Sequence, residues 1–207
     1  MATANSYRLP RFKVFVDYWN FQLLINEIQK DDRTKIDWTK LGEWLSEQAS
    51  LRAKIKPYSY EGVNIYTSYN PKKEKDTYYK WVKTWLNKQP GMQVFCSERQ
   101  TKRPPTCPCC HKPIENCPHC KGKIVGTVEK GVDALIVTDM IRLAWEDAYD
   151  VAVLASSDRD LIPGVKFLDN KGKKVIHAGF PPIGSDLAQA CWASFDIAPK
   201  ISEIVRS

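Results

Sequence analysis

The sequence predicts an α/β fold of three layers, in which helices cover both faces of a mainly parallel sheet. Short apolar runs that suit buried strands alternate along the chain with segments that suit amphipathic helices, and this order is typical of βαβ units. The right-handed crossovers of such units place helices on both faces of the sheet. With 207 residues, the chain is long enough for one compact domain with a small insert, but too short for two full domains.

The first half of the chain supplies three strands and three helices. Residues 13–17 form an apolar run that ends in a carboxylate, as expected of a strand that is buried on both faces. Asp37 is suited to cap a helix whose apolar side chains, among them Trp38 and Leu41, fall on one face. In order, we expect a strand at 13–17, helices at 21–30 and after Asp37, a strand at 63–68, a helix at 75–88 and a strand at 93–97.

The second half contains an insert and then resumes the alternation. Proline, cysteine and lysine dominate residues 100–124 and the hydrophobic periodicity disappears there, so we interpret this segment as an insert within a single domain of residues 1–207. We identify no internal repeat. Beyond the insert we expect a helix at 132–149, a strand at 151–155, a helix at 161–170, a strand at 174–178, a short helix at 186–191 and an edge strand at 195–197.

The charge of the chain suggests a polyanionic partner. The formal net charge is +7 and the pI is about 9.0, which makes nucleic acid a plausible partner, although many proteins are mildly basic for other reasons. The segment Met1–Arg11 has no apolar core of signal-peptide length. No apolar run approaches the roughly 20 residues that span a bilayer. We therefore expect a cytoplasmic protein with no membrane attachment.

Several carboxylates follow the predicted strands. Asp17 ends the first strand, Asp158 and Asp160 follow the strand at 151–155, and Asp133 starts the helix after the insert. Ligands of an open parallel sheet gather beyond the carboxyl ends of its strands, so these acids are expected to share one edge. A divalent cation would relieve their repulsion, and oxygen ligands suit Mg²⁺ or Mn²⁺. Taken singly, each acid has a structural alternative, as an Asx-turn, a helix cap or a solvated loop residue.

Three motifs in this order resemble those of the NYN domain. They are residues 14–20 (VFVDYWN), residues 130–133 (KGVD) followed by Thr138 and Asp139, and residues 156–163 (SSDRDLIP). The likeness spans about residues 11–180 and is greatest to the LabA-like branch of the PIN-like nucleases. It implies a Rossmann-like α/β/α fold and metal-dependent cleavage of RNA. It also implies that Asp17, Asp133, Asp158 and Asp160 are the metal-site acids, that Asn20 supports the site by hydrogen bonding, and that Asp139 is a weaker candidate.

The sequence departs from the family pattern at two places. Tyr18 and Trp19 follow Asp17, where the family commonly has small residues, and Ser157 replaces a common glycine. The two rings could obstruct a metal, or they could stack on bases, which contributes roughly 1–3 kcal/mol per base. The sequence leaves both readings open.

Two close pairs of cysteines lie in the insert. Cys107 and Cys110 form one CxxC pair, and Cys117 and Cys120 form a second. Two such pairs can supply four thiolates to a structural, tetrahedral Zn²⁺ in a zinc-ribbon-like arrangement. Cys109, His111 and His119 are alternative ligands. A disulfide pair suits a secreted protein better, and an iron–sulfur cluster would use the same ligands.

Basic residues near these motifs are candidates for contact with phosphates. Pro71 precedes Lys72 and Lys73 in a predicted loop, while Tyr78 and Trp85 fit the core face of the following helix better than they fit base stacking. The insert itself is basic and could grip phosphates, or it could serve as a stabilising clip or as a surface for a protein partner or a homo-oligomer. The candidate substrate-binding residues are Lys72, Lys73, Lys102, Arg103 and Lys130.

Together these observations predict a metal-dependent ribonuclease that hydrolyses RNA with Mg²⁺ or Mn²⁺ and carries a structural Zn²⁺. The alternative is an RNA-binding or regulatory adaptor that retains the fold without catalysis. A phosphatase of another Rossmann-like family is disfavoured, because residues 17–20 lack the Asp-x-Asp pair of the haloacid-dehalogenase type.

Overall fold

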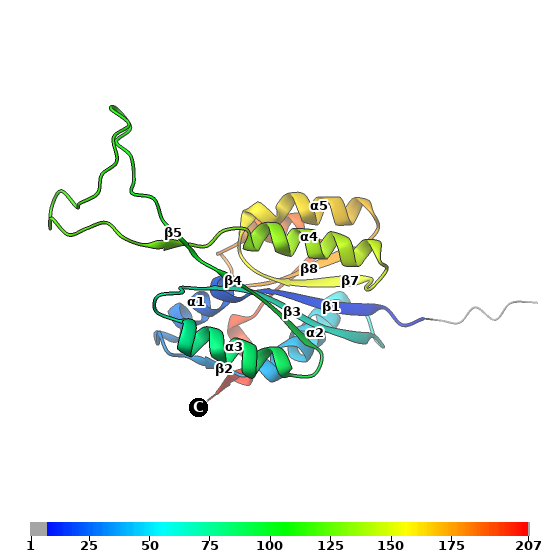
Figure 1. Cartoon of the computed structure of the whole chain (residues 1–207). Coiled ribbons are helices and arrows are strands. Elements are labelled where there is room, and N and C mark those ends of the chain that lie inside the picture. Colours follow the sequence, from blue (N-terminus) through cyan, green and yellow to red (C-terminus); the bar gives the residue numbers. More distant parts are fainter. Residues whose placement is uncertain (1–7, 207) are drawn as a thin grey trace, which may run out of the picture.

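A six-stranded sheet in which all neighbouring strands are parallel forms the centre of the computed structural model, which describes residues 8–206 (Figure 1). The expectation that Met1–Arg11 is not a signal peptide falls partly on residues 1–7, which lie outside this range. The strand order is β4-β3-β1-β7-β8-β9. The strands are β1 (Arg11–Asp17), β3 (Ser59–Tyr69), β4 (Met92–Glu98), β7 (Val151–Ala155), β8 (Lys174–Gly179) and β9 (Ala193–Asp196).

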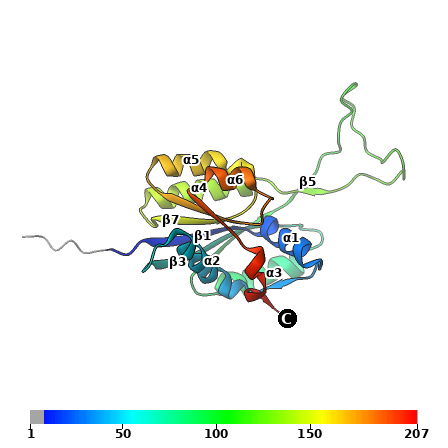
Figure 2. The same ribbon diagram turned by 180° about the vertical axis from the view of Figure 1, so that it is seen from behind.

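Helices cover both faces of the sheet, so the three-layer α/β class predicted from the sequence is confirmed (Figures 1 and 2). Side chains alternate along β1, with Val14 and Val16 packed in one core and Phe15 packed in the other. The first core lies under the helices α1 (Tyr18–Gln29), α2 (Trp38–Ala53) and α3 (Lys80–Thr84). The second lies under the helices α4 (Val132–Trp145), α5 (Ile162–Asn170) and α6 (Ser185–Ala190).

The chain adds strands to the two sides of β1 in turn, so the strand order reverses between β1 and β7. After β1 the chain adds β3 and β4 on one side, and then returns to add β7, β8 and β9 on the other side. Helices that leave β1 and β7 therefore run to opposite faces, and the carboxyl ends of these two strands flank a crevice. This is the position where open α/β sheets bind ligands.

The helix expected at 75–88 is broken into three pieces. A π-helical turn η1 (Lys75–Tyr79) precedes α3, and a 3₁₀ turn η2 (Leu86–Lys88) follows it. The wide turn points two consecutive rings at the sheet: the hydroxyls of Tyr78 and Thr67 lie 2.6 Å apart, and the ring of Tyr79 stacks on Tyr69 at 4.3 Å. An unbroken α-helix was the expectation from the apolar periodicity. Tertiary contacts thus override the simple periodicity.

Other elements begin or end at different residues from those expected. α1 starts at Tyr18 directly after β1, and α4 ends at Trp145. A 3₁₀ turn η3 (Arg159–Leu161) precedes α5, and a 3₁₀ helix η4 (Ala198–Glu203) precedes the final strand. None of the helices in the described part of the chain is long and apolar enough to cross a membrane.

An unpredicted strand pair joins distant parts of the chain near the start of α2. β2 (Lys35–Ile36) pairs in antiparallel fashion with β10 (Val205–Arg206). Asp37 follows β2 and caps α2 as predicted, accepting a hydrogen bond from the Thr39 N–H at 3.2 Å. It also forms an ion pair with Arg206 at 2.8 Å. The hydrogen bond from Arg206 is the main cause that lowers the pKa of Asp37 to about 2.

Asp37→Ala is expected to destabilise the protein by about 1 kcal/mol at neutral pH, since it removes both the helix cap and the ion pair. The folded pKa of Asp37, about 2, lies below its ordinary value of 3.8. The charge-dependent part of its contribution is therefore present above about pH 4 and is lost as the pH falls to about 2. Urea unfolding of both proteins at the two pH values checks this.

Asp37→Asn provides the matched control, because asparagine is as good a helix cap as aspartate but carries no charge. It should lose only the part of the stability that depends on the ion pair. A difference between wild type and Asp37→Asn that persists unchanged at about pH 2 would contradict the assignment to the carboxylate charge.

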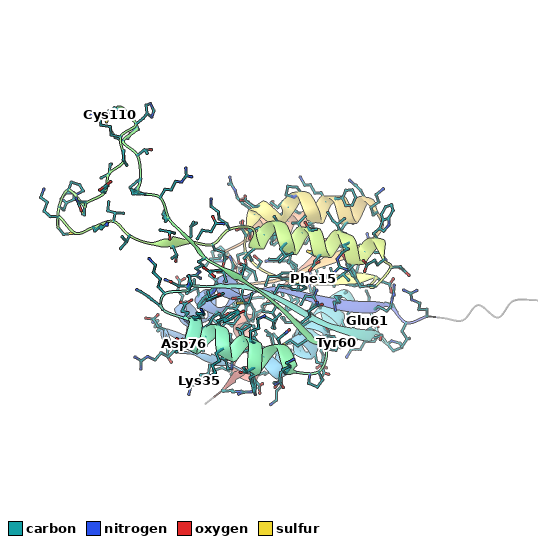
Figure 3. The ribbon with its side chains drawn as sticks, viewed as in Figure 1. Phe15, Lys35, Tyr60, Glu61, Asp76 and Cys110 are labelled. Carbon is teal, nitrogen blue, oxygen red and sulfur yellow. The ribbon has the colours of Figure 1, made fainter. Side chains whose placement is uncertain are left out.

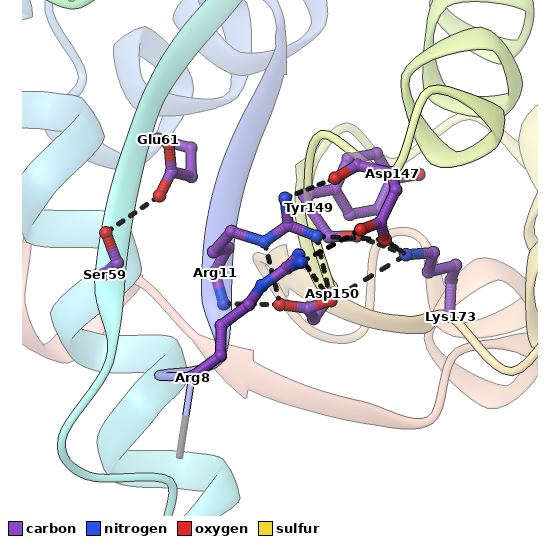
Figure 4. A network of polar contacts seen from close by, with 8 residues as sticks. All are labelled: Arg8, Arg11, Ser59, Glu61, Asp147, Tyr149, Asp150 and Lys173. Atoms are coloured by element: carbon purple, nitrogen blue, oxygen red, sulfur yellow. Dashed lines mark hydrogen bonds and ion pairs between the residues drawn. The ribbon is translucent and has the colours of Figure 1, made fainter. Parts of the chain in front are cut away.

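An ion-pair network ties the start of β1 to the loop before β7 (Figure 4). The Arg11 side chain donates to both carboxylate oxygens of Asp150, at 3.1 Å each. Arg8 and Lys173 add contacts to Asp147 at 3.0 and 2.9 Å. The network lies at the amino-terminal edge of the central strands, opposite the crevice described above. We therefore assign it a structural role.

Candidate active site

Asp17 lies where β1 passes directly into α1. Its carboxylate caps the helix by accepting a hydrogen bond from the Asn20 N–H at 3.3 Å. The second carboxylate oxygen accepts one from the Ser156 hydroxyl, also at 3.3 Å. The residue is 5% exposed. The structural alternative for Asp17 from the sequence was an Asx-turn, whereas the structure makes it the N-cap of α1. This cap also fixes the direction of the carboxylate.

Asn20 holds the loop after β7 against α1. Its side-chain oxygen accepts a hydrogen bond from the Ser157 N–H at 2.8 Å. Within the loop, the Ser156 hydroxyl accepts from the Asp158 N–H at 3.1 Å, and the Asp158 carboxylate accepts from the Asp160 N–H at 2.8 Å. Gly184, with a φ of +75°, packs so closely that a Cβ there would lie 2.9 Å from the Cβ of Ser157. The loop is thus fixed on both sides.

Asp133 lies in the first turn of α4. Gly131 precedes the helix with a φ of +82°, in the left-handed region that favours glycine, and this turn brings the chain from the insert onto the helix. Asp133 is half-buried. A carboxylate in the first turn also interacts favourably with the helix dipole, which holds whether or not it has a catalytic role.

A cavity of about 260 Å³ brings three of the four predicted acids together. Asp17 comes from the end of β1, Asp133 from α4 and Asp158 from the loop after β7. Asn20, Lys130 and Trp19 also line it. Asp160 is exposed and does not line the cavity, but its charge is close enough to act on Asp133. Segments distant in the sequence therefore meet at the predicted crevice.

The acids in this cavity perturb one another. Burial raises the pKa of Asp17 to about 7, against the opposing hydrogen bond from Asn20, and the charges of Glu129 and Asp133 add to the rise. Burial also raises the pKa of Asp133, with further contributions from Asp158, Glu129 and Asp160. Such mutual repulsion is the condition that a bound cation relieves.

Glu129 and Arg99 belong to this region and were missed in the sequence analysis. Glu129 lines the cavity and accepts a hydrogen bond from the Ser68 hydroxyl. That hydroxyl in turn accepts one from the Arg99 guanidinium at 2.9 Å. Glu129 stands two residues before Gly131 in the second motif, so its position was a usable signal. Arg99 sits at the edge of the insert, and only the fold brings it here.

The two rings after Asp17 have different environments. Tyr18 is buried and stacks on Trp38, with ring centroids 4.6 Å apart and an interplanar angle of 15°. Trp19 lines the cavity wall, where its indole N–H donates to the Ser68 carbonyl at 2.7 Å and the Arg99 guanidinium lies 5.0 Å from its ring. Both rings are held by the fold, so neither stands free across the cavity. Asp139 accepts a hydrogen bond from the Tyr66 hydroxyl, pairs with Arg142 and does not line the cavity.

The predicted phosphate-binding residues fall at three places. Lys130 lies in the acidic cavity. Lys72 and Lys73 line a separate cavity of about 290 Å³ with Arg99, at the base of the insert. Lys102 and Arg103 are exposed on the segment that leads into the insert. Only Lys130 shares a cavity with the acids, so these cations do not form one continuous cluster.

The insert projects from the body as two loops beyond the short strand pair of β5 (Gln100–Thr101) and β6 (Thr127–Val128) (Figures 1 and 3). The Cys107 and Cys117 N–H groups donate to the carbonyls of Lys112 and Gly122, respectively. His111 and Lys121, with φ of +56° and +59°, close the two turns. The loops are thus two copies of one knuckle at an offset of ten residues, a repeat that we did not identify from the sequence.

Backbone N–H groups in each knuckle point at the first cysteine. Those of Cys110 and Cys109 lower the pKa of the Cys107 thiol, and those of Cys120 and His119 lower the pKa of Cys117. This arrangement stabilises thiolates, which are the form that binds metal. The two cysteine pairs lie on separate loops. Across residues 8–206, no group of three or more His, Cys, Asp or Glu side chains lies close enough together to hold a metal ion.

Comparison with known protein families matches residues 11–197 to the NYN domain. "Uncharacterized protein y4oD" of Sinorhizobium fredii (strain NBRC 101917 / NGR234) is 46% identical over 54 residues, which are 26% of this chain and 25% of that protein. Alignment with the crystal structure of a protein of unknown function, VPA0982, from Vibrio parahaemolyticus RIMD 2210633 gives a TM-score of 0.57 at 15% identity, over 98% of this chain and 100% of that chain. This last likeness concerns the fold alone.

Proposed function

The chain belongs to the NYN family, which is part of the PIN-like nuclease superfamily, and on this premise we propose that it is a metal-dependent ribonuclease. The observation that carries the proposal is the convergence of Asp17, Asp133, Asp158 and Glu129 on one cavity at the switch point of the sheet. The three-motif likeness supports the LabA-like branch of the family. We further propose that residues 1–207 act as one cytoplasmic domain.

The donor set fits a hard divalent cation. The four side chains offer only carboxylate oxygens, which are the ligands that Mg²⁺ and Mn²⁺ prefer. The pKa values of Asp17 and Asp133 are raised first by burial and then by the neighbouring carboxylates. Asp17, Asp133 and Asp158 would hold the ion, with Glu129 beside them and Asp160 at the rim. When bound, such an ion supplies charge neutralisation and a water of lowered pKa.

The other residues of the site bind and orient the substrate. Asn20 fixes the Ser157 peptide and so sets the distance between the acids of β1 and those after β7. Lys130 lines the cavity and would neutralise a phosphate that enters it. Lys72 and Lys73 at the base of the insert, with Lys102 and Arg103 further along, would guide the strand beyond the cleavage point.

The insert is proposed to bind one structural Zn²⁺. Cys107 and Cys110 of one knuckle and Cys117 and Cys120 of the other would supply the four thiolates of a zinc-ribbon-like site at 100–124. The N–H groups that lower the pKa of Cys107 and Cys117 support this role. Binding would draw the two separate knuckles together, and it would make the insert either a basic grip on RNA or a surface for a partner.

One observation favours a second candidate, a non-catalytic RNA-binding adaptor. Among residues 8–206, the acids do not form a ready-made group of three around a metal position. An adaptor would keep the fold and the basic surface but would not need the carboxylates to approach one another.

Cleavage assays on RNA and DNA, with Mg²⁺, Mn²⁺ or EDTA, distinguish the two candidates. We expect cleavage of RNA that EDTA stops and that Asp158→Asn lowers by at least about 100-fold, because loss of a ligand removes several kcal/mol of transition-state stabilisation. Asp169→Asn, an exposed change on α5 that does not touch the cavity, is the matched control. Well-folded protein that cleaves none of the substrates would support the adaptor instead.

A further inference from the structure

A second cavity, of about 720 Å³, lies on the other side of the first turn of α1. Five aromatic residues line it: Tyr18, Trp38, Tyr78, Trp81 and Trp85. Its volume is within the range of about 300–1,000 Å³ that is typical of small-ligand sites. From the sequence we assigned Tyr78 and Trp85 to the core. They do pack against it, but they are only half-buried and form part of this cavity wall.

The rings of this aromatic groove form a connected series. Trp81 and Trp85, one helical turn apart, stack at 5.7 Å with an interplanar angle of 19°. The centroid of the Tyr78 ring lies 5.9 Å from that of Trp81 and 5.2 Å from that of Tyr18. Tyr18 and Trp38 are almost fully buried, so they form the floor of the groove. Trp81 and Trp85 are half-buried and form its accessible wall.

The charges at the aromatic groove suit an anionic, aromatic ligand. Lys35 (labelled in Figure 3) and Arg206 line it, and among its described lining residues none carries a carboxylate. The Arg206 guanidinium lies 6.0 Å from the Trp85 ring and is held there by its ion pair with Asp37. This contrasts with the acidic cavity, which is lined by four carboxylates.

The aromatic groove and the acidic cavity are neighbours. Tyr18 lines the first and Trp19 lines the second, and these residues are consecutive at the start of α1. The Trp19 ring lies 5.0 Å from Tyr18 and 5.2 Å from Tyr78. A nucleic-acid strand with one phosphate among the carboxylates would therefore have nearby bases within reach of the aromatic wall.

We propose that the aromatic groove binds unpaired bases of a single-stranded nucleic acid, with Lys35 and Arg206 contacting the flanking phosphates. Stacking on tryptophan accepts any base, because every base has a π-face, whereas a duplex keeps its bases stacked on one another. The groove would thus select single strands over duplexes. This inference deepens the proposed nuclease function and places substrate selection in α1, α3 and the C-terminal strand.

Binding of a short oligonucleotide to the protein as purified, with no Mg²⁺ or Mn²⁺ added so that the proposed cleavage is stopped, tests the inference. The probes are a single strand, the same sequence as a duplex, and a strand of equal length that lacks bases. We expect the single strand to bind about 5- to 150-fold more tightly than the baseless strand, as stacking of one base allows, and to quench tryptophan fluorescence. Equal affinity for the strand with bases and the strand without them would overturn the proposal, as would equal affinity for the duplex.

Trp81→Leu should remove most of this base dependence, while Trp145→Leu should leave it intact. Trp145 is 84% exposed at the far end of α4 and provides a matched tryptophan control. Arg206→Gln should weaken binding of the normal and the baseless strand alike, and retention of full affinity would contradict the role of this residue. If Trp81→Leu does not fold, the comparison of the probes on the wild-type protein still decides.

The outcomes separate this inference from the nuclease proposal. Base-dependent binding by a protein that never cleaves RNA would sink the nuclease and leave the aromatic groove as a binding site. Cleavage of RNA without base-dependent binding would support the nuclease and overturn the proposed role of the aromatic groove.

Discussion

Asp17→Asn is expected to lower the rate of metal-dependent cleavage by about 10²- to 10⁴-fold, which corresponds to roughly 3 to 5 kcal/mol. Asparagine still offers an oxygen to the Asn20 N–H, so the cap on α1 is retained. The lost feature is the negative charge at the centre of the proposed metal site. Rates measured at saturating Mg²⁺ or Mn²⁺ check this, because a variant that only weakened metal binding would recover.

The same change is expected to stabilise the metal-free protein at neutral pH. Burial and neighbouring acids raise the folded pKa of Asp17 to about 7, above its ordinary value of 3.8. The folded state therefore binds a proton more tightly than the unfolded state, so stability falls as the pH rises from about 4 to about 7. An uncharged asparagine avoids this loss. We expect a gain of about 1–3 kcal/mol above pH 7, since one pKa unit corresponds to about 1.4 kcal/mol.

Thermal unfolding in EDTA at low and neutral pH separates the two effects. Ser156→Ala is a useful comparison, because it removes the hydrogen bond to Asp17 but not the charge. We expect Asp17→Asn to be more stable than the wild-type protein and nearly inactive, as is common for catalytic acids. A variant that is inactive because it is unfolded would not support a role for Asp17 in the chemistry.

Removal of the proposed Zn²⁺ is expected to unfold the insert and leave the six-stranded sheet intact. Between β5 and β6 the insert has only isolated backbone bridges and its cysteines are half-buried or exposed, so apolar packing contributes little there. Structural Zn²⁺ sites contribute about 10–16 kcal/mol of apparent binding free energy at pH 7, and small metal-bound segments unfold without the ion. Protease cleavage confined to residues 102–126 after chelation, with the main unfolding transition unchanged, is the expected result.

Cys117→Ser should lose the bound metal, whereas Cys109→Ser should keep it. Cys109 lies in the same insert but is not one of the proposed ligands, so it provides a control for the cysteine-to-serine change itself. Metal analysis should give one Zn²⁺ per chain. Two ions per chain would indicate that each knuckle binds its own metal, and zinc retained by Cys117→Ser would contradict the four-thiolate site.

The sequence by itself determined the fold class, the order of the six central strands and the three motifs. Buried parallel strands such as β7 are continuous apolar runs, and helices such as α2 carry a periodic face and a cap at Asp37. These are local patterns, so they can be read without the fold. The rule that ligands gather at the carboxyl ends of parallel strands then placed Asp17 and Asp158 at one edge, although their catalytic role stays a prediction.

Only the tertiary structure decided which side chains share a cavity. Glu129 lines the cavity, and Ser68 of a neighbouring strand links it to Arg99. No local pattern records the contact with Arg99. The aromatic groove likewise combines α1, α3 and the C-terminal strand, and the π-turn that aims Tyr78 follows from packing against β3. Local patterns fix which residues are buried in an element, whereas long-range packing fixes which elements meet. For this reason the sequence could predict that acids gather at this edge of the sheet, but it could not predict the aromatic groove beside them.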